Sequence, residues 1–563
     1  MKDHGVSPPL EMTNKTIIRV ILASAFLILI VAIVILSWVP PTAKDELVHH
    51  LAVPKLYLKH GGMYEIPFMS FSYYPMNLQL LYLVPLYFGN DIVPKFIHFA
   101  FALLTAWLVF LYLRPRLGGS YALFGALFFL SVPIVVKLSI SAYIDLGVIF
   151  FSFASLLLLL KWRESRFRTR FLVYSGIMVG LAMGTKYNAL VTTALLTLFV
   201  PIMYAREVRG KFFRSALHGL LFLSVALLLF SPWMARNYSW KNNPIYPLYE
   251  NVFNPQRISE SAEGQERKSL INSGLGVFVI REGIYQEKWW EIALVPLRIF
   301  FEGKDGSPKH FDGKLNPFLL LFPFFAFRRP RESQENVERE KKVFLVFAVL
   351  FFAIAFFTSD LRIRYIGPII PVLVVLSVMG AERLHRAIGN IRDPKAKTMA
   401  FVFLIVALGS TLAYNGRYLI QQFKEVEPFG YIDGKVDRHE YLERHRPDYG
   451  AMRFINSYLP QDAKVMLVFL GSRGYYCDRD YVYGDEALGS VFLGSRSAEE
   501  MSLKLGEMGV THLLIYDPLF ARWASDNLKE GMESNLKPFF LNFAKLIYSH
   551  KGFSLFALRN GSS

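Results

Sequence analysis

Long apolar runs recur along the first three quarters of the chain and constrain its fold more than any other feature. Val20–Val39 is a run of twenty residues without a charge, long enough to cross a bilayer core of roughly 30 Å as a helix. It is too long for the apolar part of a signal peptide and lacks a small-residue cleavage site, so we expect a retained first span. The sequence therefore predicts a polytopic α-helical membrane protein.

About eleven transmembrane helices are predicted from these runs. They lie at about residues 18–39, 96–113, 121–138, 142–160, 171–185, 188–204, 216–233, 315–327, 343–358, 366–380 and 399–415. Residues 281–300 are ambiguous and could lie along the membrane surface.

The formal charge of +17 is distributed in a way that predicts topology. Nearly all of it falls on the N-terminal segment and on alternate short loops, which are rich in Lys and Arg. Short basic loops are cytoplasmic in multi-pass proteins. We therefore expect a cytoplasmic N-terminus in the plasma (inner) membrane and an extracytoplasmic C-terminal domain, and the charge does not indicate nucleic-acid binding.

Two domains are expected. Residues 1–415 would form the transmembrane domain with outer loops 40–95 and 234–314, and residues 416–563 a soluble extracytoplasmic α/β domain. In that domain Lys464–Phe469, Val510–Tyr516 and Phe553–Leu558 are predicted strands, and Ser497 to Glu500 is a capping-box pattern that opens a helix. The single cysteine, Cys477, excludes an intrachain disulfide.

The segment after the first span carries an unusual concentration of ionisable residues. Pro40 and Pro41 end the helix, and Asp45, Glu46, His49 and His50 follow at once. An interfacial acid pair facing water would explain this pattern. The functional alternative is a general base, or a divalent metal bound by Asp45, Glu46 and His50, held against a lipid-borne substrate. Asp45 and His49 are spaced i, i+4 for one helix face, but no complete ligand set is near.

Asp145 is a second acid, in the turn between the third and fourth predicted spans. An ionisable residue beside an apolar span is a functional hypothesis by default, although an exposed turn aspartate is the alternative. Cations are predicted on the same outer side, and together they could form a phosphate site, although each alone could contact lipid headgroups. They are Lys186, Arg236, Arg362 and Arg364.

Tyr73, Tyr74 and Trp233 are either interface aromatics or surfaces that stack on a sugar. Acids supply a base, and cations stabilise negative charge on a leaving phosphate. Both lie on the side of the membrane where nucleotide donors are absent. A polyprenyl-phosphate-linked sugar is a donor that fits this compartment.

Six short motifs in order resemble those of the GT-C membrane glycosyltransferases, the superfamily of protein O-mannosyltransferases and lipid A aminoarabinose transferases. The acid after the first span and the first-loop Tyr-Pro element come first. The later motifs are A-Y-x-D-L (142–146), G-x-A-x-G-T-K-Y (180–187), P-W-x-x-R-N (232–237) before N-P-I-Y-P (243–247), and R-Y-x-x-P-I-x-P (364–371).

The resemblance implies a hexosyl- or pentosyltransferase that moves a sugar from an undecaprenyl- or dolichyl-type phosphate to an acceptor hydroxyl. It implies a catalytic role for Asp45, with Glu46 as the adjacent candidate and Asp145 as the second acid. The donor phosphate would bind Lys186, Arg236 and Arg364, and Arg362 is a further candidate from the residues. His49, His50, Tyr73 and Tyr74 would contact substrate. No cofactor is certain, and the acceptor could be a lipid, a glycan or a protein.

Other function classes stay open at this stage. A transporter or flippase for lipid-linked sugars predicts internal repeats and ionisable residues near the bilayer midplane, and neither is evident. A noncatalytic membrane protein could bind glycan through its outer domain. A hydrolase of lipid-linked sugars would use water in place of the acceptor.

Overall fold

The computed structural model describes residues 10–208, 210–255, 276–328, 335–484, 487, 489–527 and 533–559. The chain divides into two compact units. The helical unit comprises Met1–Trp38, Tyr74–Leu81 and Val93–Pro428, and the sheet unit comprises Val39–Tyr73, Tyr82–Ile92 and Phe429–Ser563. Each unit therefore contains segments that are distant in sequence.

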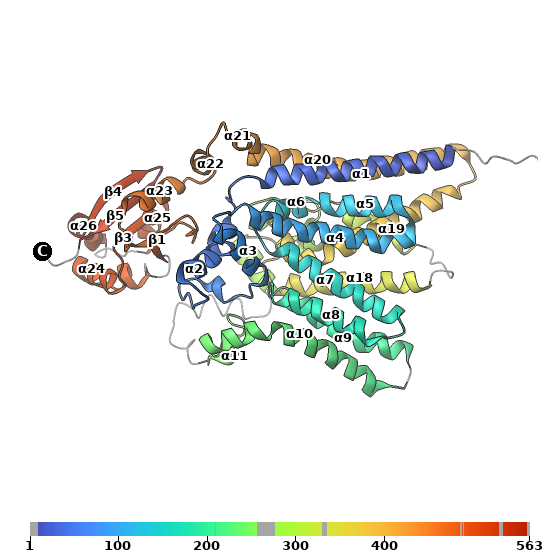
Figure 1. Cartoon of the computed structure of the whole chain (residues 1–563), viewed down its shortest axis with the longest axis horizontal. Coiled ribbons are helices and arrows are strands. Elements are labelled where there is room, and N and C mark those ends of the chain that lie inside the picture. The colour runs from blue at the N-terminus through green and yellow to red at the C-terminus, as the bar shows by residue number, and fades with distance from the viewer. Residues whose placement is uncertain are drawn as a thin grey trace, which may run out of the picture. The chain divides into compact units, whose positions relative to one another are not determined.

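Long helices that run alongside one another build the helical unit (Figure 1). They are α1 (Leu10–Ser37), α4 (Val93–Leu117), α5 (Gly119–Ser131), α6 (Pro133–Ser139), α7 (Asp145–Glu164), α8 (Thr169–Met183), α9 (Ala189–Glu207), α10 (Phe212–Lys241), α17 (Phe318–Ala326), α18 (Glu335–Thr358), α19 (Ile370–Gly389) and α20 (Pro394–Val426). Shorter helices occupy the connections: α3 (Asn77–Tyr87), α11 (Glu250–Phe253), α14 (Gly276–Phe278), α15 (Trp289–Ala293) and α16 (Val295–Arg298).

The predicted multi-pass membrane architecture is confirmed. In the described part of the chain, eight helices are long and apolar enough to cross a membrane, and α5 with α6 supplies a ninth if the pair crosses as one span bent by 65°. The two remaining predicted spans coincide with α8 and α17, which are shorter. Each of the eleven predicted runs therefore coincides with a helix or a helix pair.

The bend between α5 and α6 has a local cause. Pro133 has no backbone N–H to continue α5, and it is instead the first residue of α6, where a missing donor costs nothing. Helix α6 then ends at Ser139, just before the turn that leads to Asp145. The proline thus redirects the chain toward one of the candidate site residues.

Glycines allow close contact between neighbouring helices. A Cβ added to Gly180 of α8 would lie 2.7 Å from the Ala226 carbonyl oxygen of α10, and one added to Gly380 of α19 would lie 2.0 Å from the Phe322 carbonyl oxygen of α17. In membrane bundles small residues let helix backbones approach one another. These two glycines therefore set the α8–α10 and α17–α19 contacts.

The sheet unit contains a five-stranded sheet of order β2-β1-β3-β5-β4. Strand β1 pairs in parallel with β2 and β3, whereas β5 pairs antiparallel with β3 and β4. The strands are β1 (Lys464–Val468), β2 (Asp480–Tyr483), β3 (His512–Tyr516), β4 (Ala544–His550) and β5 (Phe553–Leu558). The helices are α21 (Pro428–Ile432), α22 (Arg438–His445), α23 (Tyr449–Tyr458), α24 (Ala498–Glu507), α25 (Asp517–Asn527) and α26 (Glu533–Asn542).

Three predicted strands and the capped helix of this domain are confirmed. Ser497 Oγ accepts a hydrogen bond from the Glu500 N–H, and Glu500 Oε2 accepts one from the Arg496 N–H, so the cap of α24 is formed. Strands β2 and β4 were not predicted. Strand β2 is only four residues long, and β4 is an edge strand with few buried side chains, so neither has a strong apolar signal.

Loop 40–95, the predicted first outer loop, belongs largely to the sheet unit. Its helix α2 (Ala52–His60) carries Lys55, whose Nζ donates to the Tyr475 carbonyl and to Asp478 Oδ1, both at 2.7 Å. Lys59 donates to Asp480 Oδ1 at 2.7 Å. The two compact units therefore do not follow the predicted domain boundary at residue 415. Most of loop 40–95 belongs to the same unit as the C-terminal domain, and helix α20 continues to Val426.

Candidate active site

Asp145 and Lys186 form a buried ion pair in the helical unit. Asp145 is the first residue of α7, and Lys186 lies in the short turn between α8 and α9. Lys186 Nζ lies 2.7 Å from Asp145 Oδ1, and their side chains are 14% and 3% exposed. Asp145 Oδ2 has no hydrogen-bond partner in the part of the chain that the structure describes. The carboxylate therefore holds the ammonium group through Oδ1, and Oδ2 is buried.

His98 of α4 fixes the turn that carries Asp145. Its Nδ1 lies 2.9 Å from the Leu138 carbonyl oxygen and 2.8 Å from that of Ser141, and its Nε2 accepts from the Leu146 N–H at 2.9 Å. The imidazole therefore carries its proton on Nδ1 and ties both ends of the turn to α4. The sequence analysis did not predict His98. Its position as an ionisable residue within an apolar span is the signal that could have identified it.

Arg364 joins this cluster, whereas Arg362 only adjoins it, with its guanidinium 5.9 Å from the Tyr365 ring centre. The Arg364 guanidinium lies 5.6 Å from the Tyr143 ring centre and 5.4 Å from that of Tyr365, and Lys186 Nζ lies 5.4 Å from the same Tyr365 ring. Both cations thus share one aromatic ring, which is favourable for each through cation–π attraction. The site around Asp145 therefore gathers two of the four predicted cations.

Arg362 belongs to a second network, which the sequence did not predict. Its Nε lies 2.9 Å from Asp360 Oδ2, and its Nη1 lies 3.8 Å from Asp312. Lys137 of α6 pairs with Asp312 at 3.0 Å and with Asp305 at 3.1 Å. These contacts join the loop before α17 to α6 and to the loop before α19, so Arg362 has a structural partner set of its own.

Arg236 lies near the end of α10 among aromatic rings. It donates to the Tyr74 carbonyl oxygen at 3.1 Å and to Asn237 Oδ1 at 2.9 Å, and its guanidinium is 4.6 Å from the Trp233 ring centre. The Tyr74 ring lies 5.3 Å from that of Tyr187, the residue after Lys186. Arg236 and Tyr74 therefore adjoin the turn that carries Lys186.

In the sheet unit, Asp45 and Glu46 have different environments. Glu46 is 1% exposed, and its Oε2 accepts a hydrogen bond from the Ala43 N–H at 2.8 Å, whereas Asp45 is partly exposed. The Leu51 N–H donates to the Glu46 carbonyl oxygen five residues earlier, so this turn is wider than the α-helix that the i, i+4 spacing of Asp45 and His49 assumed. Glu46 therefore caps the turn from which Asp45 projects.

His49, His50 and Tyr73 lie in the same unit. The His49 and His50 ring centres are 4.0 Å apart, and the His49 ring stacks on Phe71 at 4.4 Å. Tyr73 donates its hydroxyl proton to Glu65 Oε1 at 2.6 Å. No group of three His, Cys, Asp or Glu side chains that could hold a metal is found among the described residues, and a metal bound by Asp45, Glu46 and His50 stays a prediction.

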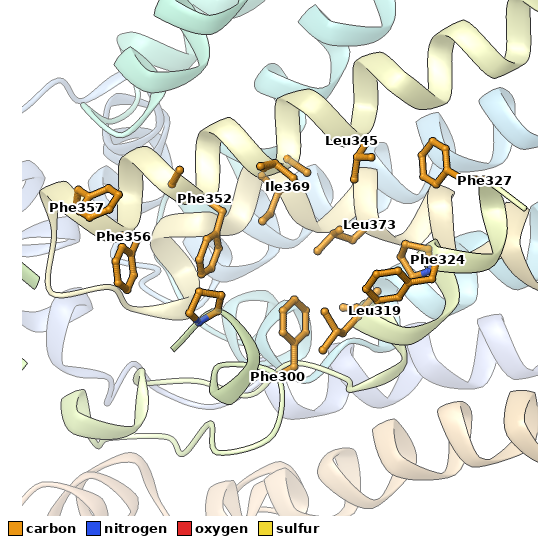
Figure 2. Close-up of a pocket in the computed structure, with 16 residues that line it drawn as sticks. Phe300, Leu319, Phe324, Phe327, Leu345, Phe352, Phe356, Phe357, Ile369 and Leu373 are labelled. Carbon is orange, nitrogen blue, oxygen red and sulfur yellow. The ribbon is translucent and has the colours of Figure 1, made fainter. Parts of the chain in front are cut away.

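An apolar groove of about 590 Å³ lies beside the helical site. Figure 2 shows its lining from α17, α18 and α19, with Phe357 and Phe356 at one end and Phe327 at the other. Ile369 lines the groove and ends the short 3₁₀ segment Ile363–Ile369 that also carries Arg364. The groove and the cation cluster therefore share one element.

Part of the chain matches a known family. Residues 75–235 match the family model described as dolichyl-phosphate-mannose-protein mannosyltransferase. The matched segment includes Asp145 and Lys186. A comparison with curated proteins gave no match.

Solved structures match nearly the whole chain. ArnT from Cupriavidus metallidurans bound to undecaprenyl phosphate has a TM-score of 0.56 at 15% identity, covering 96% of this chain and 97% of that chain. The chain has the GT-C fold. A second match is the archaeal oligosaccharyltransferase AglB from Archaeoglobus fulgidus, in complex with an inhibitory peptide and a dolichol-phosphate. Its TM-score is 0.51 at 12% identity, and the match covers 96% of this chain and 74% of that chain. The predicted resemblance to GT-C glycosyltransferases is thus confirmed at the level of the fold.

Proposed function

We propose that this GT-C chain is an integral-membrane glycosyltransferase that moves a sugar from a polyprenyl-phosphate donor to an acceptor hydroxyl at the outer face of the membrane. The observation that carries the proposal is the buried cluster of Lys186, Arg364 and Asp145 at the ends of membrane helices. Lys186 is paired with Asp145, and Arg364 lies over the same Tyr365 ring as Lys186, so the cluster keeps a positive charge to bind a phosphate. The likeness to ArnT bound to undecaprenyl phosphate supports the same donor class.

The apolar groove suits the polyprenyl chain of such a donor. Its lining residues are almost entirely apolar, and it follows α18, which is long enough to span a membrane. Burial of an apolar chain there stabilises binding by about 25 cal/mol per Å² of apolar surface. With the chain in this groove, the phosphate would lie toward the 3₁₀ segment that carries Arg364.

The proposed reaction is a single displacement. The Asp45 carboxylate accepts the proton of the acceptor hydroxyl, and the hydroxyl oxygen forms a bond to C1 of the sugar. The bond from C1 to the phosphate oxygen breaks, and its electron pair leaves with the polyprenyl phosphate, whose charge Lys186 and Arg364 stabilise. One displacement inverts the anomeric configuration, so a product with retained configuration would contradict this mechanism.

Asp145 and Glu46 act as positioning residues in this proposal. Asp145 holds the Lys186 ammonium group at 2.7 Å, and Glu46 is engaged with the Ala43 N–H. Arg236 and Tyr74 would complete the donor side, and His49, His50 and Tyr73 would lie near the acceptor.

Transfer can be tested with purified protein in lipid nanodiscs, a panel of radiolabelled undecaprenyl-phosphate sugars, and membrane extract as acceptor. We expect label in a new product with wild type. Asp45→Asn should reduce the rate by about 10²-fold or more, as expected for loss of a general base, and Glu46→Gln should reduce it less.

Asp433→Asn is the matched control, because Asp433 is an exposed carboxylate paired only loosely with Lys435 at 3.3 Å. Equal rates for wild type and Asp45→Asn would overturn the role of Asp45. Absence of label transfer with every donor would overturn the proposed function. Repeating the wild-type assay with a chelator, then with added Mg²⁺ or Mn²⁺, tests metal dependence.

A further inference from the structure

A polar pocket of about 430 Å³ lies in the sheet unit, between helices α22 and α23 and strand β4. This volume is in the range of small-molecule sites. The lining residues come from the end of α22, from one side of α23 and from the end of β4 with its turn: Glu443, Pro447, Gly450, Arg453, Phe454, Ser457, Tyr458, Tyr548, Ser549, His550 and Lys551. None of them belongs to the candidate active site.

One face of α23 forms a wall of the pocket. Gly450, Arg453, Phe454, Ser457 and Tyr458 are spaced i, i+3, i+4, i+7 and i+8, which places them on one side of an α-helix. The residues of α23 that are buried in the domain lie at other positions of the helix. This second face contacts strand β4 through Phe454 and Gly450, whereas its Arg453, Ser457 and Tyr458 side chains are exposed.

Aromatic rings form the apolar part of this wall. The Phe454 ring centre lies 4.7 Å from that of Tyr458 and 4.9 Å from that of Tyr548. Tyr458 is 73% exposed. The three adjoining rings are tilted by 34° and 40° to one another and form a continuous apolar surface, one ring of which is largely exposed to water.

The base of the pocket depends on close contacts. A Cβ added to Gly450 would lie 3.0 Å from the Tyr548 hydroxyl oxygen, so the glycine lets that tyrosine approach α23. Lys551 and Gly552 have φ values of 50° and 77° and form the two-residue turn between β4 and β5. The turn places Lys551 and His550 at the rim.

The polar groups around the rings carry more positive than negative charge. Arg453 Nη1 pairs with Glu443 Oε1 at 3.2 Å, and both side chains are about half exposed. Lys551 and His550 add basic groups without a further acid among the lining residues. Ser457 and Ser549 add hydroxyl groups that can donate or accept.

We propose that this pocket binds a short acidic saccharide. A sugar ring presents C–H groups on its faces and hydroxyl groups at its edge, which matches an exposed aromatic ring bordered by Ser, Glu and Arg side chains. A carboxylate on the sugar would pair with Lys551 and Arg453. The inference goes beyond the proposed function, because binding requires neither the donor nor transfer.

The test is saturation-transfer NMR on the full chain in nanodiscs, with empty nanodiscs as the blank. The probes are digalacturonic acid and cellobiose, an acidic and a neutral disaccharide. We expect digalacturonic acid to bind with a millimolar Kd that weakens with added salt, and cellobiose to bind at least about fivefold more weakly, which is about 1 kcal/mol.

Variants separate the pocket from nonspecific binding. Tyr458→Ala removes the exposed ring, and Lys551→Asn removes the charge while keeping a residue that tolerates positive φ. Each substitution should raise the Kd for digalacturonic acid about fivefold or more. Leu503→Ala is the control, since Leu503 is 66% exposed on α24 and does not line the pocket.

Three outcomes would overturn the proposal: no saturation transfer from wild type, an unchanged Kd in both Tyr458→Ala and Lys551→Asn, or equal binding of cellobiose. The measurement contains no donor, so its result is independent of whether the chain transfers sugar.

Discussion

The Tyr476 hydroxyl donates a hydrogen bond to the Pro41 carbonyl oxygen at 2.7 Å. Next to it, the Tyr475 N–H donates to the Leu47 carbonyl oxygen at 3.2 Å. The two accepting carbonyls lie on either side of Asp45 and Glu46 in the sequence. A pair of adjacent tyrosines from the C-terminal domain thus holds both ends of the segment that carries the proposed base.

Removing this hydroxyl should impair catalysis more than folding. Tyr476→Phe leaves the buried Pro41 carbonyl without its donor, a loss of about 1–3 kcal/mol, and loosens the Asp45 segment. We expect kcat to fall by about tenfold with little change in donor KM, because a misplaced base affects the transition state. Tyr431→Phe, which removes a hydroxyl elsewhere in the sheet unit, is the control. Equal kcat values for the two variants would show that the contact does not position the base.

The buried pair of Asp145 and Lys186 should show strong coupling in stability. Asp145→Asn leaves the Lys186 ammonium group buried without its counter-charge and should destabilise the protein by about 3–5 kcal/mol. Lys186→Met should leave the Asp145 carboxylate buried without its counter-charge and should destabilise the protein similarly. The double variant should lose less free energy of unfolding than the sum of the losses in the two single variants. Unfolding of all four proteins in the same detergent measures this coupling. Strictly additive losses would mean that the pair contributes no interaction energy.

Gly380→Ala should prevent normal packing of α19 on α17. The added Cβ would lie 2.0 Å from the Phe322 carbonyl oxygen, a backbone atom that cannot move without shifting the helix. Overpacking of this kind costs about 1–3 kcal/mol or more. Gly389→Ala is the matched control, because the same change near the end of α19 meets no atom within 4 Å. Size-exclusion yield and thermal unfolding should separate the two variants; similar behaviour would contradict this close contact.

Cys477 should resist thiol reagents until the protein unfolds. Burial raises the pKa of its thiol to about 11, compared with about 8.5 for an unfolded cysteine. The folded thiol therefore stays protonated at pH 8.5, where half of the unfolded thiols are reactive thiolates, and its labelling should rise only as the pH approaches the folded value. Maleimide labelling from pH 7 to 10, with and without denaturant, measures this difference. Rapid labelling of the folded protein at pH 7 would contradict it.

The sequence predicted the membrane helices well because apolar runs are local signals. Each of the eleven runs coincides with a helix or a helix pair, and the α24 cap forms as its Ser497–Glu500 spacing predicts. Strand β4 was missed because its side chains alternate weakly and much of it is exposed. Its identity as a strand depends on pairing with β5, which a local pattern does not contain.

The sequence predicted the individual residues of the candidate site better than it predicted which of them lie together. Asp145, Lys186 and Arg364 were singled out individually, yet only the fold places them in one cluster and assigns Arg362 to Asp360 and Asp312. His98 escaped prediction because a single histidine in an apolar span has no partner in sequence. Its three backbone contacts come from residues about 40 to 48 positions away, which only tertiary structure brings together.

The sharing of one compact unit by the first outer loop and the C-terminal domain has a consequence for biosynthesis. Membrane chains are made from the N-terminus onward, so the loop around Asp45 leaves the ribosome long before Lys55 and Pro41 can meet their partners at Tyr475 to Asp478. The proposed catalytic base therefore gains its surroundings only when the sheet unit has been made and folded. A nascent chain whose helices are all inserted but whose sheet unit is unmade would remain inactive.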